Sequence, residues 1–264
     1  MSTPLLICAD DFGYAPAVNE GIAELVMQGR VTATSCLTMS PHWPEAAAVA
    51  RTLEGRADLG LHLDLTEFAR HASLPRLLIA GRLGLLSRGA LRERIATQLS
   101  RFEDGVGAAP DYIDGHQHVH QVPEVARLLI DELVRRYAAS LPWVRVSAPA
   151  AGDLKSRIIA ATGAAQLRRL LDDAGLRHTT RLLGVYDFRD SPAWLDRVAG
   201  WLNEVRPGDA LMVHPSLRAV AGDPLSAARV REFEGLSSVR FGTLLTQCRV
   251  SPARGSSLAL PVAA

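Results

Sequence analysis

The stretch PLLICADDFGYAPAVNEGIAELVMQG, residues 4–29, contains one strand–helix unit and guides the interpretation of the whole chain. Its first six residues form an apolar run with the length of a buried strand. Residues 15–29 carry apolar side chains at helical spacing and end at Gly29, a residue typical of helix ends. Two acids, Asp10 and Asp11, follow the strand directly. A strand followed by a helix is the repeating unit of a parallel sheet covered by helices.

The same alternation recurs about seven times along the chain. Further strands are expected at 31–38, 57–65, 112–120, 143–148, 181–188 and 209–215, and helices at 44–55, 90–104, 122–137, 154–175, 193–205 and 229–236. This order predicts an α/β fold in the form of a TIM-like (β/α) barrel, either regular or with one irregular or missing unit. A doubly wound open sheet is the alternative.

The domain organisation follows from the same pass along the chain. No boundary divides it, so residues 1–250 are expected to form a single domain. Residues 74–89 form a less regular segment, and residues 239–247 fit neither pattern clearly. The tail, residues 251–264, is rich in Ser, Ala, Gly and Pro and is expected to be loose.

Composition excludes several classes of partner. The chain has 264 residues, with 29 basic against 28 acidic side chains and a net charge of +1. This balance gives no electrostatic footprint for nucleic acid or an anionic membrane surface. No apolar run reaches the ~18 residues of a membrane helix. Three cysteines without a CxxC pair, and no leader-like N-terminus, predict a cytoplasmic protein. A homodimer is the default assembly for such a chain.

The stretch DYIDGHQHVHQVPE, residues 111–124, concentrates three histidines. If it is a strand, whose side chains alternate faces, then Asp114, His116, His118 and His120 share one face. Three imidazoles cannot all bind one small ion together with other ligands, so one is expected to be a ligand. The others then contact substrate or solvent, with His120 as the bystander. Asp114 could orient a ligand histidine, because metal-bound imidazoles usually donate their other N–H to an acceptor.

Other polar residues also fall at the carboxyl ends of strands, where α/β folds place their chemistry. Asp10 and Asp11 follow a buried apolar run, where adjacent carboxylates repel each other unless a cation is bound. A single acid there could equally cap the next helix. His62 lies near the end of an apolar strand and could be a metal ligand. His214, before a proline, could be a general acid or a turn residue.

Four motifs in this order resemble those of the YdjC-like (ChbG/HpnK) carbohydrate deacetylase family. They are CADDFGYAPAVNEGI at 8–22, GLHLDLTE at 60–67, DYIDGHQHVH at 111–120 and LMVHP at 211–215. The resemblance runs from about residue 4 to 216 and implies a TIM-barrel-like fold. It also implies a metal-dependent hydrolase that removes the acetyl group from an N-acetylated amino sugar or oligosaccharide.

Site residues are implied by position in these motifs. A divalent metal, magnesium by the family's usage, would be held by Asp11, His62 and His116. Asp10 would then act as general base, and His214 as general acid for the leaving amine. Two imidazoles are softer ligands than magnesium normally selects, so zinc is a physically reasonable alternative.

Two departures from the family pattern make the substrate expected from the sequence less specific. The family commonly has Asp-Ser-His-His-His where this chain has Gly115 and Gln117 within its cluster, and residues 74–89 do not match. Deacylation of an amide or ester is therefore the broader expectation. We expect His118, Arg145 and Tyr14 to contact the substrate.

Two other functions remain open. One Asp and two His are also the ligand set of non-haem iron oxygenases, although these sites usually occupy β-sandwich folds. A barrel could also bind carbohydrate without turnover, but such a receptor needs neither a general base nor a general acid.

Overall fold

The computed structural model describes residues 2–69, 72–150, 159–190 and 193–261. Its sheet is parallel throughout, and seven strands follow the order β5-β4-β3-β2-β1-β7-β6, with β8 pairing β1. The strands are β1 (Thr3–Phe12), β2 (Ala33–Cys36), β3 (Asp58–Leu63), β4 (Tyr112–Gly115), β5 (Trp143–Val144), β6 (Leu182–Leu183), β7 (Ala210–Val213) and β8 (Val250–Pro252). Strand β1 is central, because it pairs with three other strands.

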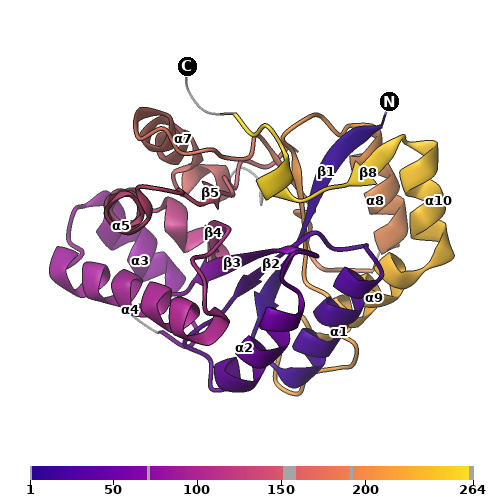
Figure 1. The fold of residues 1–264 in the computed structure, drawn as a ribbon, viewed down its shortest axis with the longest axis horizontal. Helices are drawn as coiled ribbons and strands as arrows, with labels where there is room; N and C mark the ends of the chain where they lie inside the picture. The colour runs from indigo at the N-terminus through magenta and orange to yellow at the C-terminus, as the bar shows by residue number, and fades with distance from the viewer. Residues whose placement is uncertain (1, 70–71, 151–158, 191–192, 262–264) are drawn as a thin grey trace.

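Helices cover the outside of this sheet (Figure 1). They are α1 (Pro16–Met27), α2 (Trp43–Thr52), α3 (Leu74–Arg82), α4 (Arg88–Val106), α5 (Pro123–Tyr137), α7 (Ala164–Asp173), α8 (Trp194–Asn203), α9 (Ser226–Ser237) and α10 (Val239–Gln247). The core lies between helices and sheet, and β1 is buried from Leu5 to Phe12. Burial on both faces explains why this strand reads as a continuous apolar run. None of the helices in the described ranges has the length and apolar character needed to cross a membrane.

The two edges of the sheet approach each other through isolated contacts. Val144 bridges to His178 and Pro149 bridges to Leu182, both in the parallel sense. The sheet therefore curves into an irregular barrel with seven main strands, which confirms the predicted TIM-like α/β fold with an irregular or missing unit.

Strands β5 and β6 are much shorter than the predicted strands 143–148 and 181–188. The N–H of Arg145 still donates to the Ile113 carbonyl of β4, but the next two amides find side-chain acceptors in place of strand partners. Val146 N donates to Thr179 Oγ1 at 2.9 Å, and Ser147 N donates to Gln121 Oε1 at 3.0 Å. Side-chain oxygens thus satisfy the backbone, and the regular ladder ends.

Further differences from the sequence-based expectations concern residues 74–89 and the C-terminal segment. Residues 74–89 contain α3 and the start of α4, and residues 239–247 are helical. Residues 251 and 252, the first of the tail expected to be loose, form β8 together with Val250, and this strand pairs with the first residues of β1. Ser256 then donates to the buried Asp58 through its backbone N and its hydroxyl. The predicted helix 154–175 breaks at Gly163 as expected, and residues 151–158 lie outside the described residues.

Candidate active site

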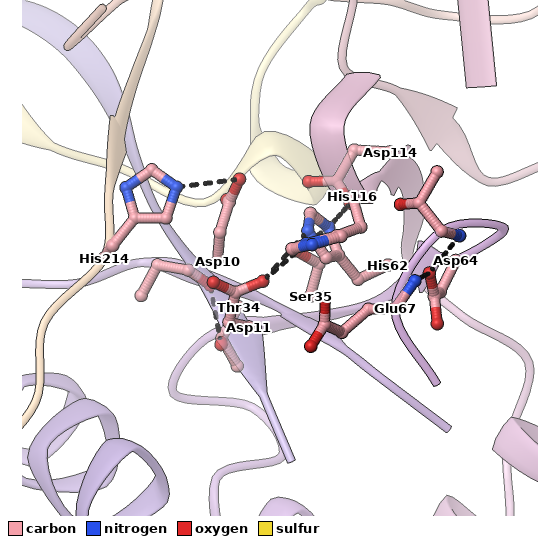
Figure 2. A network of polar contacts seen from close by, with 12 residues as sticks. Asp10, Asp11, Thr34, Ser35, His62, Asp64, Glu67, Asp114, His116 and His214 are labelled. Atoms are coloured by element: carbon pink, nitrogen blue, oxygen red, sulfur yellow. Dashed lines mark hydrogen bonds and ion pairs between the residues drawn. The ribbon is translucent and has the colours of Figure 1, made fainter. Parts of the chain in front are cut away.

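An irregularity in β1 turns two adjacent acids toward one pocket. The pairing of β1 with β2 shifts register between Ala9 and Phe12, so that β1 carries an additional residue. Asp11 adopts φ 70°, in the left-handed region that few residues other than glycine enter. A bulge of this kind redirects side chains, which would otherwise alternate between faces. Both Asp10 and Asp11 therefore line the same cavity (Figure 2).

Asp11, His62 and His116 converge as the family resemblance implies. Asp11 Oδ1 lies 3.0 Å from His116 Nδ1 and 3.4 Å from His62 Nε2. The two imidazole rings meet edge to face with centroids 5.5 Å apart. One carboxylate oxygen and two imidazole nitrogens thus point at a common position, with the three ligand atoms within 4.8 Å of one another. Figure 2 shows this convergence at the ends of β1, β3 and β4.

Asp114 orients His62 from the neighbouring strand. The two residues are paired in register between β3 and β4, and Asp114 Oδ1 accepts a 2.6 Å hydrogen bond from His62 Nδ1. Ser35 Oγ lies 3.0 Å from the same nitrogen. Burial alone would lower the pKa of His62, but Asp114 and Asp11 together raise it to about 10. The surrounding carboxylates therefore stabilise positive charge at this point of the pocket.

Arg229 contacts the other oxygen of Asp11. Its Nη2 lies 2.6 Å from Asp11 Oδ2, and both residues are buried. Burial favours the neutral form of Asp11, but the positive charge of Arg229, together with His116, outweighs it and holds the pKa well below its usual range. Asp11 is therefore an anion, which is the state that a metal ligand needs.

Asp10 has a different environment. Arg145 binds it with Nη1 2.7 Å from Oδ1 and Nη2 2.6 Å from Oδ2. Burial raises the pKa of Asp10 even though Arg145 opposes the shift. Arg145 also contacts Asp114 Oδ2 at 2.8 Å, is fully buried and does not line the pocket. The structure therefore places Arg145 beneath the two carboxylates, not at the substrate-facing position expected from the sequence.

A second group of potential ligands, Asp10, His62 and Asp114, also converges within 4.8 Å. The guanidinium of Arg145 already joins its two carboxylates. The positive charge of Arg145 thus already compensates these two carboxylates, as a bound metal ion would. The donor set of Asp11, His62 and His116 is the one that suits a small divalent metal, since it combines an ionised carboxylate with two imidazoles in a field that favours positive charge.

His214 faces Asp10 from the end of β7. Its Nε2 lies 4.0 Å from Asp10 Oδ2. A dashed line marks this contact in Figure 2. Its Nδ1 is buried and has no hydrogen-bond partner among the described residues. Burial lowers the pKa of His214 to about 3, so the ring is neutral. The backbone N–H of His214 donates to Glu232, whose other carboxylate oxygen accepts from the Tyr186 hydroxyl at 2.7 Å.

The histidine-rich stretch is not a continuous strand, which corrects the expectation that four side chains share one face. Strand β4 ends at Gly115, and residues His116–Gln121 form irregular helical turns in which Gln117 and His118 have φ of 52° and 61°. His118 Nδ1 lies 2.9 Å from Ser147 Oγ, and the side chain lines the pocket. His120 points inward, where its Nε2 donates to the Arg145 carbonyl at 2.9 Å. It is fully buried and contacts neither solvent nor the pocket.

The pocket above these groups has a volume of about 740 Å³. Tyr14 lines it, at the place expected of a substrate contact. Apolar side chains form much of the remaining wall: Leu74, Leu78, Ile159, Phe188, Met212 and Leu225. The predicted loop 74–89 therefore contributes to the pocket through α3.

Asp64, in the same motif as His62, organises the loop after β3. Its carboxylate accepts hydrogen bonds from the backbone amides of Thr66, Glu67, Phe68 and Ala69, at 2.7–2.8 Å. Figure 2 shows Asp64 turned away from the ligand cluster. Its role in this structure is to fix the loop that carries Glu67 to the pocket.

Sequence reasoning did not identify Arg229, Asp223 or Glu232. All three lie after the last matched motif, and the helix that carries Arg229 gives no motif signal. An acid or arginine at helical spacing normally belongs to a solvated helix face. Only the burial of Arg229 and Glu232 on the inner face of α9 distinguishes them, and burial depends on the fold.

Comparisons with known proteins show the family and the fold of this chain. The family described as YdjC-like protein matches residues 4–247. A carbohydrate deacetylase of Mus musculus is 38% identical over 146 residues, which make up 49% of this chain and 46% of that protein. A chitooligosaccharide deacetylase of Enterobacter sp. (strain 638) is 32% identical over 149 residues, with 53% and 59% covered. The chain thus spans about half the length of the curated relatives it matches.

Solved structures share the fold. A protein of Enterococcus faecalis V583, provisionally described as a cellobiose-phosphate cleavage protein, covers 96% of this chain and 98% of its own with a TM-score of 0.71 and 24% identity. A family 4 carbohydrate esterase from Streptomyces lividans covers 99% and 97% with a TM-score of 0.51 and 9% identity. At such identities the likeness concerns the fold alone. The family match extends over most of the sequence, and the chain belongs to the YdjC-like protein family.

Proposed function

We propose that this protein is a metal-dependent hydrolase that removes the acetyl group from an N-acetylated amino sugar or oligosaccharide. The observation that carries the proposal is the convergence of Asp11, His62 and His116 beside a separate pair, Asp10 and His214. Relatives named carbohydrate deacetylase and chitooligosaccharide deacetylase support the substrate class. An arrangement of one cation site next to a base and an acid is what hydrolysis of an amide requires.

Asp11, His62 and His116 would hold the metal. When bound, a divalent cation polarises the acyl carbonyl and lowers the pKa of water from 15.7 toward ~7. Magnesium is the family's usual metal, whereas two imidazole ligands favour zinc or a similar transition metal. Asp114 would keep His62 in the tautomer whose Nε2 faces the site, since its Nδ1 proton is engaged by the carboxylate.

Asp10 would act as the general base. The environments of the two adjacent acids push their pKa values apart, because Asp11 is held ionised by Arg229 while burial raises the pKa of Asp10. Such a separation is the pattern expected when one carboxylate serves as ligand and the other exchanges protons. Arg145 holds the Asp10 carboxylate in a single orientation toward the pocket.

His214 would deliver the proton to the leaving amine. The ring is neutral at rest, so the proton it donates must be gained during the reaction. Asp10, 4.0 Å from its Nε2, is the nearby source. In this scheme one proton passes from the attacking water to Asp10, then to His214, and then to the departing nitrogen. The products are a free amine and acetic acid, which loses its proton to water to become acetate.

Acetate release tests the proposal. The purified protein is stripped with a chelator, reloaded separately with Mg²⁺, Zn²⁺ or Co²⁺, and assayed on N-acetylglucosamine, chitooligosaccharides and O-acetylated sugars. We expect metal-dependent acetate release that is lost in His62→Ala and His116→Ala. A histidine outside the pocket offers a matched control, and His42→Ala should leave the rate unchanged.

Three results would contradict the proposal. A metal-free His62→Ala protein with the wild-type rate would remove the metal from the scheme. Sugar binding in a calorimeter with no acetate produced across the series would favour a carbohydrate-binding barrel. Oxygen consumption with a 2-oxo acid would instead favour an iron oxygenase.

A further inference from the structure

Arg229 divides the two oxygens of Asp11 between different tasks. Oδ1 faces His116 and His62 at 3.0 and 3.4 Å. Oδ2 lies 2.6 Å from Arg229 Nη2 on the opposite side of the carboxylate. One oxygen is thus engaged by a permanent positive charge, and only the other is available to the ligand cluster.

The guanidinium of Arg229 is itself held in place. Its Nε donates to Asp223 Oδ2 at 2.6 Å, and its carbon lies 5.0 Å from the centre of the Tyr14 ring. The side chain is 2% exposed, and its Nη1 is buried without a hydrogen-bond partner among the described residues. Because three contacts fix the group, it cannot swing away to release Asp11 Oδ2.

This arrangement affects different cations unequally. Ca²⁺ takes six to eight oxygen ligands and often both oxygens of a carboxylate, and Mg²⁺ also binds mainly oxygen. Zn²⁺ and Co²⁺ bind imidazole nitrogen well and need fewer ligands. A neighbouring positive charge weakens the attraction of the site for every cation. Only cations that bind strongly to His62 and His116 compensate for this weakened electrostatic attraction.

We propose that Arg229 is a residue that determines metal specificity, because it restricts Asp11 to one coordinating oxygen and so favours Zn²⁺ or Co²⁺ over Mg²⁺ and Ca²⁺. The inference rests on the metal role proposed for Asp11. It concerns binding of the metal alone, and it assigns Arg229 to positioning Asp11, with Asp223 as the residue that holds Arg229.

Metal titration without substrate tests this inference. Dissociation constants for Zn²⁺, Co²⁺, Mg²⁺ and Ca²⁺ are measured by calorimetry and chelator competition for the wild type and for Arg229→Gln combined with Asp223→Asn, which removes both charges of the pair. We expect Mg²⁺ and Ca²⁺ to bind about tenfold more tightly relative to Zn²⁺ in the variant, since a nearby like charge is removed and Oδ2 is freed. The visible absorption of bound Co²⁺ should become weaker in the variant, because a second oxygen from Asp11 raises the number of ligands around the ion.

The control is Arg240→Gln, which removes an exposed arginine of α10 that is paired with Asp196 of α8, and it should leave all four constants unchanged. If the double variant does not fold, Arg229→Met with Asp223→Leu is the second variant, which fills the space with apolar side chains and leaves Asp11 as the one carboxylate without this cation. An unchanged ratio of Zn²⁺ to Mg²⁺ affinity in a folded variant overturns the inference. An equal loss for all four metals does so too, because Arg229 would then only orient Asp11. Neither result depends on acetate release.

Discussion

Arg145 and Asp10 form a fully buried bidentate ion pair, with both guanidinium–carboxylate distances at 2.6–2.7 Å, although they are 135 positions apart in the sequence. The same guanidinium reaches Asp114 at 2.8 Å, which in turn binds His62. One arginine therefore links the proposed base to the residue that orients a proposed metal ligand. A buried cation with two carboxylate partners is costly to disturb, because each partner would be left uncompensated.

Replacing Arg145 by Met should destabilise the fold by about 3–5 kcal/mol, since Asp10 and Asp114 would lose the positive charge between them. Urea denaturation of the metal-free protein measures this change. The exposed variant Arg240→Met is the control, because surface ion pairs contribute at most about 1 kcal/mol. Equal stability of the two variants would show that the buried pair is not important for folding.

Asp10→Asn should retain the metal and lose turnover by about 10²–10⁴-fold, because the amide cannot accept a proton from water. The variant keeps the shape of the side chain and one oxygen for Arg145. Metal content by mass spectrometry and the rate of acetate release are measured on the same sample. A rate within a few fold of the wild type would exclude Asp10 as the base.

Asp114→Asn should weaken metal binding by about 10–100-fold, as is typical when the acceptor behind a ligand histidine is changed. Asp114 is buried and makes its 2.6 Å contact with His62 Nδ1, so the expected loss concerns the orientation of that ring. Calorimetric titration with Zn²⁺ provides the measurement. Wild-type affinity in the variant would indicate that β3 alone positions His62.

Glu232 should make stability depend on pH. Burial raises its pKa from 4.5 to about 7, so the folded protein binds a proton more tightly than the unfolded chain does. The contribution is fully present below pH 4.5 and is lost as the pH rises through about 7, with a total of about 3 kcal/mol. Glu232→Gln removes this titration. The wild type should therefore lose stability relative to the variant between pH 5 and pH 8 in urea denaturation, and a constant difference would contradict the assignment.

The sequence predicted those parts of the molecule that depend on local patterns. The alternation of apolar runs and helical segments predicted the barrel. The apolar runs could be identified as strands because the strands of a parallel sheet are buried on both faces. Asp10, Asp11, His62, His116 and His214 could be identified because each follows or ends such a strand. Motif resemblance then ordered them into ligands, base and acid.

Features that depend on distant contacts could not be predicted in this way. Arg229 reaches Asp11 across 218 residues, and nothing in its helix distinguishes it from a solvated arginine. Arg145 was expected to face the substrate, but two carboxylates hold it below the pocket. The prediction that His116, His118 and His120 share one face of a strand was wrong, because Gln117 and His118 adopt left-handed backbone conformations. Side chains alternate between faces only as long as the strand continues.

The bulge at Asp10 and Asp11 has a consequence for protein design. Two carboxylates that are neighbours in sequence share one cavity only because the local pairing with β2 is interrupted. A designer who grafts this constellation onto an idealised barrel would find the acids on opposite sides of the wall unless the extra residue is carried over with them. In this protein, the irregularity in the ladder is what brings both carboxylates into the pocket.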